Sequence, residues 1–356
     1  MADVVRLNRD ETLDLVKGLG ILLVYLGHTL YTRSVPCRLI FFVHMPLFFL
    51  VSGMLFDPAR YRSIGALLKK TFIGLVIPYF LFVIAAYVFK FDIQFQWWRT
   101  SPWGQLYGLF ARGDSVWALW FLICLGSVRI VYYIAYRIGC ERGIVSKLIL
   151  ILLCLIGAEC SMRYLSPYRK YVPFMLSSVP AALFYFSVGR FCRDRMRAWL
   201  SSDGRSLVPV AVFVIACVCM FAFEWLCPIR KFDLRTGVFS VAGLPPSLLG
   251  LTAIGALVVL LRSWAPGFIR RWLLFCGTYS LIFFSMEQNV SHVYSAVLRW
   301  CGIDAPEVYY KVSGMAIVKT GRVIFCFAIV AVLVPAIDRL LKALQRRLML
   351  VGFKKT

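Results

Sequence analysis

The sequence predicts an all-α protein that crosses a lipid bilayer about ten times. Of its 356 residues, 61% are hydrophobic and only 16% are charged, whereas soluble domains use about 45–50% apolar residues. The apolar residues gather in runs of about 20, which is the length that spans the hydrocarbon core as a helix. The polar stretches between these runs are short, so we expect a single membrane domain over residues 1–356.

Ten apolar runs follow one another along the chain. The polar segment 1–11 precedes the first run, which has no small-residue cleavage site, so we expect this run to remain as a membrane span. The basic tail 339–356 follows the last run and is expected to lie in the cytoplasm. The predicted spans are residues 12–31, 38–56, 71–90, 116–136, 145–164, 173–191, 206–227, 244–262, 273–296 and 313–337.

Lysine and arginine are distributed unevenly between the two sets of loops. With an even number of spans both termini share one side, and that side carries the basic segment 60–70, the arginine-rich segment 190–205 and the tail 339–356. The opposite loops hold fewer cations, so the positive-inside rule predicts that both termini are cytoplasmic. The net charge of +23 therefore indicates topology rather than nucleic-acid binding, which needs a basic face on a soluble surface.

The first two spans contain polar side chains that a simple lipid anchor would avoid. Asp14, Lys17 and His28 lie in the first span and His44 lies in the second. A charged side chain at the membrane centre costs about 2.5–3.5 kcal/mol on insertion scales, which makes such groups functional-site candidates. Two simpler readings stay open: Lys17 can extend to the headgroups, and His44 can be an interfacial residue bonded to the backbone.

The spacing of these residues predicts an arrangement across the membrane. Lys17 and His28 are eleven residues apart, so they lie within about 20° on one helix face and roughly 16 Å apart along the axis. Asp14 can pair with Lys17, three residues later, but it is too far from His28 to orient the imidazole. The predicted topology places His28 and His44 in the outer half of the membrane, with Glu287 deeper on the ninth span.

Further ionisable residues lie in the predicted membrane region. Lys319 and Arg322 enter the tenth span from the outer side, and Glu224 lies near the outer end of the seventh. The two cations are candidate partners of Glu287 or Glu224, and such pairing alone would explain their presence in a membrane.

Two segments resemble the membrane acyltransferase-3 family. The first-helix motif of that family is similar to the spacing found here, in which Asp14 lies three residues before Lys17 and His28 lies eleven residues after it. The segment 42–53, with Phe-Val-His-Met-Pro-Leu-Phe-Phe and then Ser-Gly, resembles the branch that O-acetylates sugars, including fucose O-acetylase-like proteins. The resemblance implies a ten-span protein of the bacterial cytoplasmic (inner) membrane. One departure is Glu287, which stands where the family often has a His.

The resemblance implies an enzyme that moves an acetyl group from acetyl-CoA to a hydroxyl of a surface glycan or a lipid-linked sugar. A neutral imidazole is the usual base for a hydroxyl near neutral pH. We therefore expect His28 to be the general base, with Glu287 as its orienting carboxylate and His44 as a stabiliser of the oxyanion. Lysine binds phosphate as a point charge, and the residues expected to bind the cytoplasmic donor are Lys17, its partner Asp14, Lys69 and Lys70.

We expect no metal and no nucleic acid in this reaction, and the oligomeric state stays open, with a homodimer as one option. The competing class is a transporter of a small molecule or lipid-linked sugar, in which intramembrane His, Glu and Lys residues form a pathway. The sequence shows no paired halves with broken helices, which many transporters have, and this favours the enzyme.

Overall fold

The structure is a computed structural model that describes residues 10–30, 34–89, 119–227, 232–237, 239–303 and 315–351. Its described elements are helices joined by short turns, and no strand occurs among them, which confirms the all-α prediction. The main helices are α1 (Glu11–Thr29), α2 (Val35–Leu55), α3 (Ile64–Thr71), α4 (Ile77–Phe89), α6 (Trp120–Ile138), α7 (Ile144–Cys160), α8 (Val179–Phe191), α9 (Arg193–Leu200), α10 (Leu207–Leu226), α11 (Leu244–Trp264), α12 (Gly267–Thr278), α13 (Ser280–Trp300) and α15 (Met315–Val351).

Seven of the described helical segments are long and apolar enough to cross a membrane. They coincide with the predicted second, third, fourth, fifth, seventh, eighth and tenth spans. The segments predicted as first, sixth and ninth spans are also helical, but α1 and α13 contain more polar residues and α8 has only 13 residues. The structure therefore supports a multi-pass membrane protein, and the count of ten stays a prediction.

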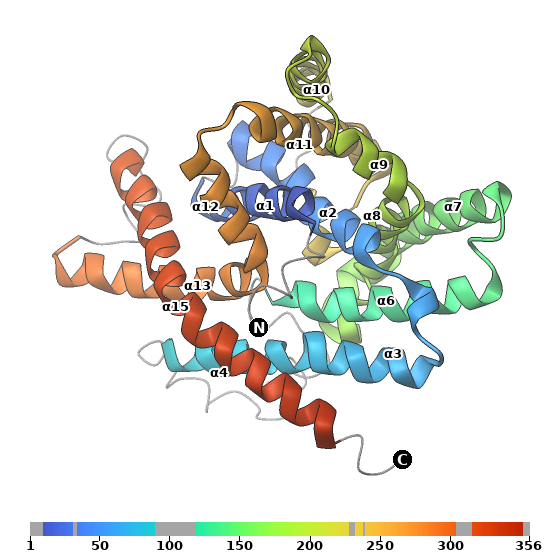
Figure 1. Cartoon of the computed structure of the whole chain (residues 1–356), viewed down its shortest axis with the longest axis horizontal. Helices are drawn as coiled ribbons and strands as arrows, with labels where there is room; N and C mark the ends of the chain where they lie inside the picture. The colour runs from blue at the N-terminus through green and yellow to red at the C-terminus, as the bar shows by residue number, and fades with distance from the viewer. Residues whose placement is uncertain are drawn as a thin grey trace.

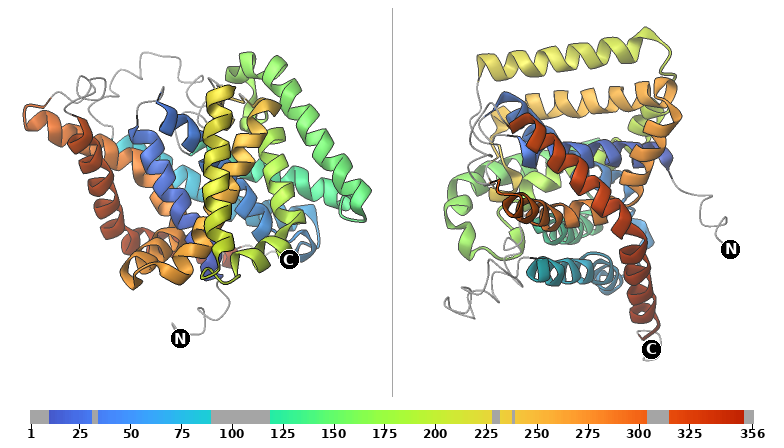
Figure 2. Two further views of the ribbon diagram at one scale, coloured as in Figure 1. Left: turned by 90° about the horizontal axis from the view of Figure 1, so that it is seen from above. Right: turned by 90° about the vertical axis from the view of Figure 1, so that its left-hand side faces the viewer.

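Helices α1 and α2 lie at the centre of the assembly (Figure 1). Helices α10 and α11 run along one side of them, α3 and α4 along the opposite side, and α12, α13 and α15 flank a third side. Helix α10 forms an outer layer over α11 (Figure 2), with apolar side chains such as Val214 and Phe221 exposed. An exposed apolar face of this kind suits contact with lipid tails.

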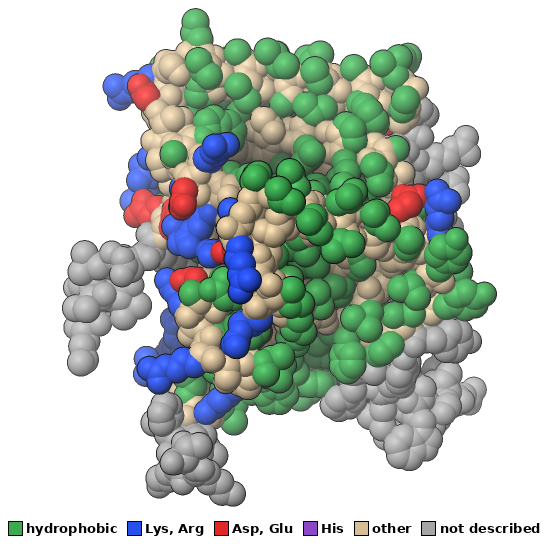
Figure 3. Space-filling view, turned by 90° about the vertical axis from the view of Figure 1, so that its right-hand side faces the viewer, with side chains coloured by type: hydrophobic (Ala, Val, Ile, Leu, Met, Phe, Trp, Pro, Cys, Tyr) green, Lys and Arg blue, Asp and Glu red, His purple; other side chains and the backbone are tan. Residues whose placement is uncertain are grey.

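Charged side chains gather at one end of the molecule. Figure 3 shows Lys and Arg along one edge of the view, while hydrophobic side chains cover most of the remaining face. This separation is what a membrane protein with one basic side requires. It is consistent with the predicted topology, in which that side is cytoplasmic.

The predicted ninth span, 273–296, is not one helix. It is broken at Tyr279, between α12 and α13. Near the break the α12 backbone lies directly against α1. A Cβ on Gly277 would collide with the carbonyl oxygen of Asp14, and a Cβ on Gly18 would collide with the carbonyl oxygen of Leu273. Small residues permit such close contact between membrane helices, and the contact fixes the end of α1 that contains Lys17.

The helical segment of the third span begins earlier than predicted. Lys69 and Lys70 lie in the last turn of α3 and not in a loop, because Ser63 caps the helix by accepting a hydrogen bond from the Ala66 N–H (3.2 Å). The helix continues through a π-helical turn, Phe72–Val76, into α4. Pro78 directly follows this π-helical turn, and such local adjustments accommodate a proline within a membrane helix.

A polar network joins the basic ends of three helices. Glu141, in the turn between α6 and α7, accepts hydrogen bonds from Arg190 Nε (2.9 Å) and Nη2 (3.2 Å) and from the Tyr132 hydroxyl (2.7 Å). Arg190 Nη1 also donates to the Phe56 carbonyl at the end of α2 (3.1 Å). Desolvation acts to raise the pKa of Glu141, but the hydrogen bonds and the charge of Arg190 outweigh it and lower the pKa.

This network predicts an acid-sensitive contribution to stability. A carboxyl group whose pKa is lowered on folding stabilises the fold above its unfolded pKa of about 4.3, and that stability is lost as the pH falls through the lower folded value. We expect Glu141→Gln to lower the unfolding temperature in detergent at pH 6, and the gap from wild type to narrow as the pH approaches 3. Glu159→Gln, which breaks an exposed pair with Arg163, is the matched control. A gap that is constant over this range would contradict the prediction.

Candidate active site

A cavity of about 290 Å³, called here the His28 cavity, lies between four helices. Helix α1 contributes His28, α2 contributes His44, α6 contributes Trp120 and α13 contributes Gln288. The segment 232–237 closes one side. The remaining lining residues are Val24, Gly27, Leu30, Phe41, Met45, Asp233, Arg235 and Phe284.

His28 is held by a carboxylate from α13. Its Nδ1 lies 2.9 Å from Glu287 Oε2, and the Glu287 side chain is 1% exposed whereas that of His28 is 24% exposed. A carboxylate only accepts hydrogen bonds, so Nδ1 carries the proton and Nε2 of the neutral ring has a free lone pair. A base oriented by a buried carboxylate is the arrangement that activates hydroxyl nucleophiles in hydrolases.

Arg322 from α15 completes this group of three. Its Nη2 donates to Glu287 Oε1 (2.9 Å) and its Nη1 donates to the His28 carbonyl (2.7 Å). The positive charge of Arg322 balances the charge of Glu287 within the protein. Glu287 is therefore paired with a fixed cation as well as with the His28 ring.

His44 is arranged differently from the expected oxyanion stabiliser. Its Nδ1 lies 2.9 Å from the Ile40 carbonyl oxygen, which can only accept, so the ring donates there. Nε2 of the neutral ring is then an acceptor and not a donor, and the ring is 4% exposed, which disfavours a second proton. His44 can accept a hydrogen bond from a bound hydroxyl, but an oxyanion needs a donor. The amide of Gln288 in the same cavity supplies one.

A second cavity, called here the Lys17 cavity, has a volume of about 170 Å³ and lies along the same four helices. Lys17 is its one cation. The ammonium group pairs with Asp14 Oδ1 (2.5 Å), and Asp14 Oδ2 also accepts from the Thr278 hydroxyl (3.3 Å). The other lining residues are Phe48, Val51, Ser52, Leu55, Leu75, Phe121, Leu122, Leu125, Ser280, Leu281 and Phe284.

The two cavities meet at Phe284, which contacts Phe48 and Phe121 of the Lys17 cavity, and these three rings are called here the aromatic septum. Phe284 lines both cavities. The three rings contact one another, with centroids 5.5 Å apart for Phe121 and Phe284, 6.0 Å for Phe48 and Phe121, and 6.1 Å for Phe48 and Phe284. Lys17 therefore lines one cavity and His28 the other, and their spacing places both on one face of α1.

Two of the residues expected at the donor end lie elsewhere. Lys69 lines a separate groove of about 660 Å³ between α3 and α6, and the Lys70 ammonium lies 5.5 Å from the centre of the Tyr61 ring. Both side chains are exposed. Neither lines the Lys17 cavity, because α3 begins early and places them on its surface.

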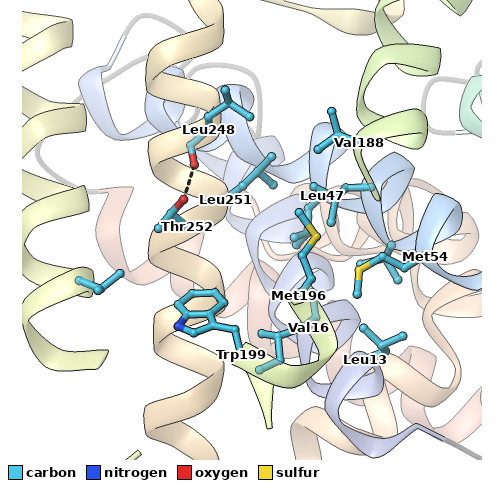
Figure 4. A pocket seen from close by; sticks show the side chains of 15 residues that line it. Leu13, Val16, Leu47, Met54, Val188, Met196, Trp199, Leu248, Leu251 and Thr252 are labelled. Atoms are coloured by element: carbon cyan, nitrogen blue, oxygen red, sulfur yellow. Dashed lines mark hydrogen bonds between the residues drawn. The ribbon is translucent and has the colours of Figure 1, made fainter. Parts of the chain in front are cut away.

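A larger cavity, about 380 Å³, adjoins the Lys17 cavity at Val51 but has an apolar lining (Figure 4). Apolar side chains such as Met54, Met196 and Trp199 surround it, and its one hydroxyl, on Thr252, donates to the Leu248 carbonyl (2.8 Å). None of its lining residues is titratable, so this cavity does not supply acid–base chemistry.

A model of a known protein family matches most of the chain. The family model described as "Acyltransferase domain" matches residues 10–337, from the start of α1 into α15. The chain belongs to the acyltransferase-3 family. No curated protein and no solved structure matches it. The family and the apolar helices together make this acyltransferase-3 protein a membrane acyltransferase.

The structure decides between candidates for the site of this acyltransferase-3 protein and adds further residues to it. Arg322 was one of two candidate partners of Glu287, and the structure selects it, while Glu224 pairs with Arg38 (2.5 Å). Asp233 and Arg235 reach the His28 cavity from a loop, and nothing in their local sequence indicates this. Trp120 is 4% exposed, and its place beside Phe121 in an apolar run left a lipid-facing position open.

Proposed function

We propose that this membrane acyltransferase moves an acetyl group from cytoplasmic acetyl-CoA to a hydroxyl of a surface glycan or lipid-linked sugar. The observation that carries the proposal is the His28–Glu287–Arg322 group, in which a buried carboxylate orients an imidazole beside a cavity. The proposal includes the sugar O-acetylating branch of the family, the bacterial inner membrane, ten spans and cytoplasmic termini.

The donor enters from the side of Lys17 and the acceptor from the side of His28. The basic end of the molecule suits the phosphates of acetyl-CoA, and the pantetheine arm would pass through the Lys17 cavity and displace the aromatic septum. The acceptor sugar would lie in the His28 cavity, where Trp120 offers a ring to stack on and Asp233, Arg235 and Gln288 offer hydrogen bonds.

In the reaction, His28 Nε2 takes the proton of the acceptor hydroxyl as its oxygen attacks the thioester carbon. The carbonyl oxygen becomes an oxyanion, to which the Gln288 amide can donate. Collapse of this intermediate breaks the C–S bond, and the proton passes from His28 to the departing sulfur. The products are the acetyl ester and free CoA. Glu287 accepts the Nδ1 hydrogen bond throughout, so the neutral ring returns to its starting tautomer.

A donor with two labels separates this function from transport. Sealed membrane vesicles containing the protein are given acetyl-CoA labelled with ¹⁴C in the acetyl group and ³H in the adenine. We expect ¹⁴C to appear in an alkali-labile ester on glycan or lipid-linked sugar while ³H stays in the medium. If both labels enter the vesicle lumen together, or neither is used, the transferase proposal fails.

The aromatic septum predicts a second measurable effect. Removing one ring by Phe121→Leu should admit water to the thioester before an acceptor is bound. We expect CoA release without acceptor, followed with a thiol reagent, to rise several-fold above wild type. Phe49→Leu is the matched control, because Phe49 contacts Phe121 with centroids 4.9 Å apart and is 0% exposed but lines neither cavity. Equal rates of acceptor-independent CoA release by Phe121→Leu and Phe49→Leu would contradict a gating role for the septum.

A further inference from the structure

The fold leaves a guanidinium nitrogen and a hydroxyl without partners beyond the Lys17 cavity. Arg129 Nε on α6 and Thr71 Oγ1 at the end of α3 are both buried, and neither makes a hydrogen bond. Buried polar groups in folded proteins are nearly always hydrogen-bonded, and leaving one unsatisfied destabilises the fold, more so when the group is charged. Two such groups on neighbouring helices indicate a ligand with acceptor oxygens.

The two groups lie on facing surfaces of α3 and α6. Gly126 is one turn before Arg129 on α6, and a Cβ on Gly126 would lie 3.4 Å from the Thr71 methyl carbon. Side chains of a helix lean toward its N-terminus, so the Arg129 side chain extends over the turn that contains Gly126. The Arg129 guanidinium and the Thr71 hydroxyl are therefore both directed toward the contact between α3 and α6 at Gly126.

Arg129 lies on the face of α6 that also lines the Lys17 cavity. Leu122 and Leu125 line that cavity, and Arg129 follows them by seven and four residues, which keeps it within about 40° of both. Trp120 in the His28 cavity is about 13 Å earlier along the helix axis. A ligand that reacts at His28 and extends through the Lys17 cavity would bring its other end to Arg129.

The charges around this place favour an anion. Among the residues that the structure describes, no carboxylate pairs with Arg129, whereas Lys17 is already paired with Asp14. Tyr61 lies close enough to Arg129 for an electrostatic interaction, and the Lys70 ammonium lies 5.5 Å from the centre of the Tyr61 ring. Lys70 and Arg129 therefore share Tyr61 as a neighbour.

We propose that Arg129 Nε and Thr71 Oγ1 bind a phosphate oxygen of the diphosphate of the acyl donor, with Lys70 close by. This inference rests on the proposed function and adds to it a binding site at the end of the donor path. The diphosphate is the anionic group that follows the pantetheine arm, so it reaches this depth when the thioester is at His28. An arginine presents directed N–H donors to phosphate in a way that a lysine does not.

The test measures binding and not catalysis. Purified wild type, Arg129→Gln and Thr71→Val in nanodiscs are titrated with CoA, with CoA that lacks its 3′-phosphate, and with pantetheine, which has no phosphate. We expect Arg129→Gln to weaken both phosphate-containing ligands by the same factor, at least tenfold, and to leave pantetheine binding unchanged. Thr71→Val keeps the shape of the side chain and should weaken the same two ligands by a smaller factor.

Two controls make the result specific. Arg137→Gln removes another cation of α6, one that donates to the Tyr133 hydroxyl (3.2 Å), and should leave the CoA affinity within twofold of wild type. Nanodiscs with and without anionic lipid distinguish the donor diphosphate from a headgroup phosphate. The inference is overturned if Arg129→Gln and Thr71→Val bind CoA like wild type, if pantetheine binding falls equally, or if anionic lipid alone removes the difference. If wild type itself does not bind CoA, the proposed function fails as well.

Discussion

Replacing His28 with alanine is expected to lower the acyl-transfer rate of the purified protein by about 10²–10⁴-fold, the usual contribution of a general base. The donor affinity should stay within about twofold, because His28 lines a different cavity from Lys17. The measurement is transfer of ¹⁴C-acetyl to the acceptor, together with CoA titration of the same preparation. A loss of transfer with unchanged CoA binding identifies a defect in chemistry.

Two variants show whether the loss is chemical or structural. His28→Gln keeps an N–H donor for Glu287 but has no basic nitrogen, so it should be as inactive as His28→Ala while retaining the wild-type unfolding temperature. The space left in His28→Ala should admit free imidazole from the medium and restore part of the rate. Activity above a tenth of wild type in both variants would remove His28 from the role of base.

Replacing Arg322 with glutamine should make the reaction strongly pH-dependent. Without the guanidinium, the buried charge of Glu287 is balanced most readily by a proton on His28, which leaves no base near neutral pH. We expect transfer at pH 7 to fall by at least tenfold and to recover partly as the pH is raised toward 9. A wild-type pH profile at reduced rate would show that Arg322 has only a structural role.

Removing one partner of a buried ion pair commonly costs about 3–5 kcal/mol of stability, so a matched variant is needed. The double variant Glu287→Gln with Arg322→Gln removes both charges and keeps amides of similar size. It should unfold at a higher temperature than Arg322→Gln and lose the alkaline recovery, because no carboxylate remains to attract a proton. Comparison of the two variants thereby separates the loss of stability from the effect of the Glu287 charge on the pH dependence of transfer.

Periodicity and hydropathy in the sequence predict most of the helices and the shared face of Lys17 and His28. Both residues line cavities along the same helices, and Asp14 pairs with Lys17 as an i,i+3 neighbour does. These features depend on local geometry, which the sequence encodes directly. The contact between His28 and Glu287 spans 259 positions, so it followed from the membrane depth of the two residues and not from local pattern.

Other features of the site depend on tertiary packing and have no local signal. The break at Tyr279 is accompanied by the close approach of Gly277 to α1, and an apolar run does not show where a neighbouring helix will lie. The bond of His44 to the Ile40 carbonyl is, in contrast, local to its own helix, and a His44 bonded to the backbone is one of the alternatives that the sequence leaves open. Asp233 and Arg235 reach the cavity because the loop folds back over it, and hydropathy cannot predict that.

The central claim is that one chain holds the donor on one side of the membrane and the base toward the other, and sidedness tests it most directly. Purified protein is reconstituted into liposomes, with its orientation determined by labelling an added C-terminal cysteine tag, and ¹⁴C-acetyl-CoA is supplied on one side only. We predict that label reaches an acceptor on the opposite side only when the donor is on the side of the C-terminus. Transfer of the same rate from either side, or transfer only to an acceptor on the donor side, would contradict the account.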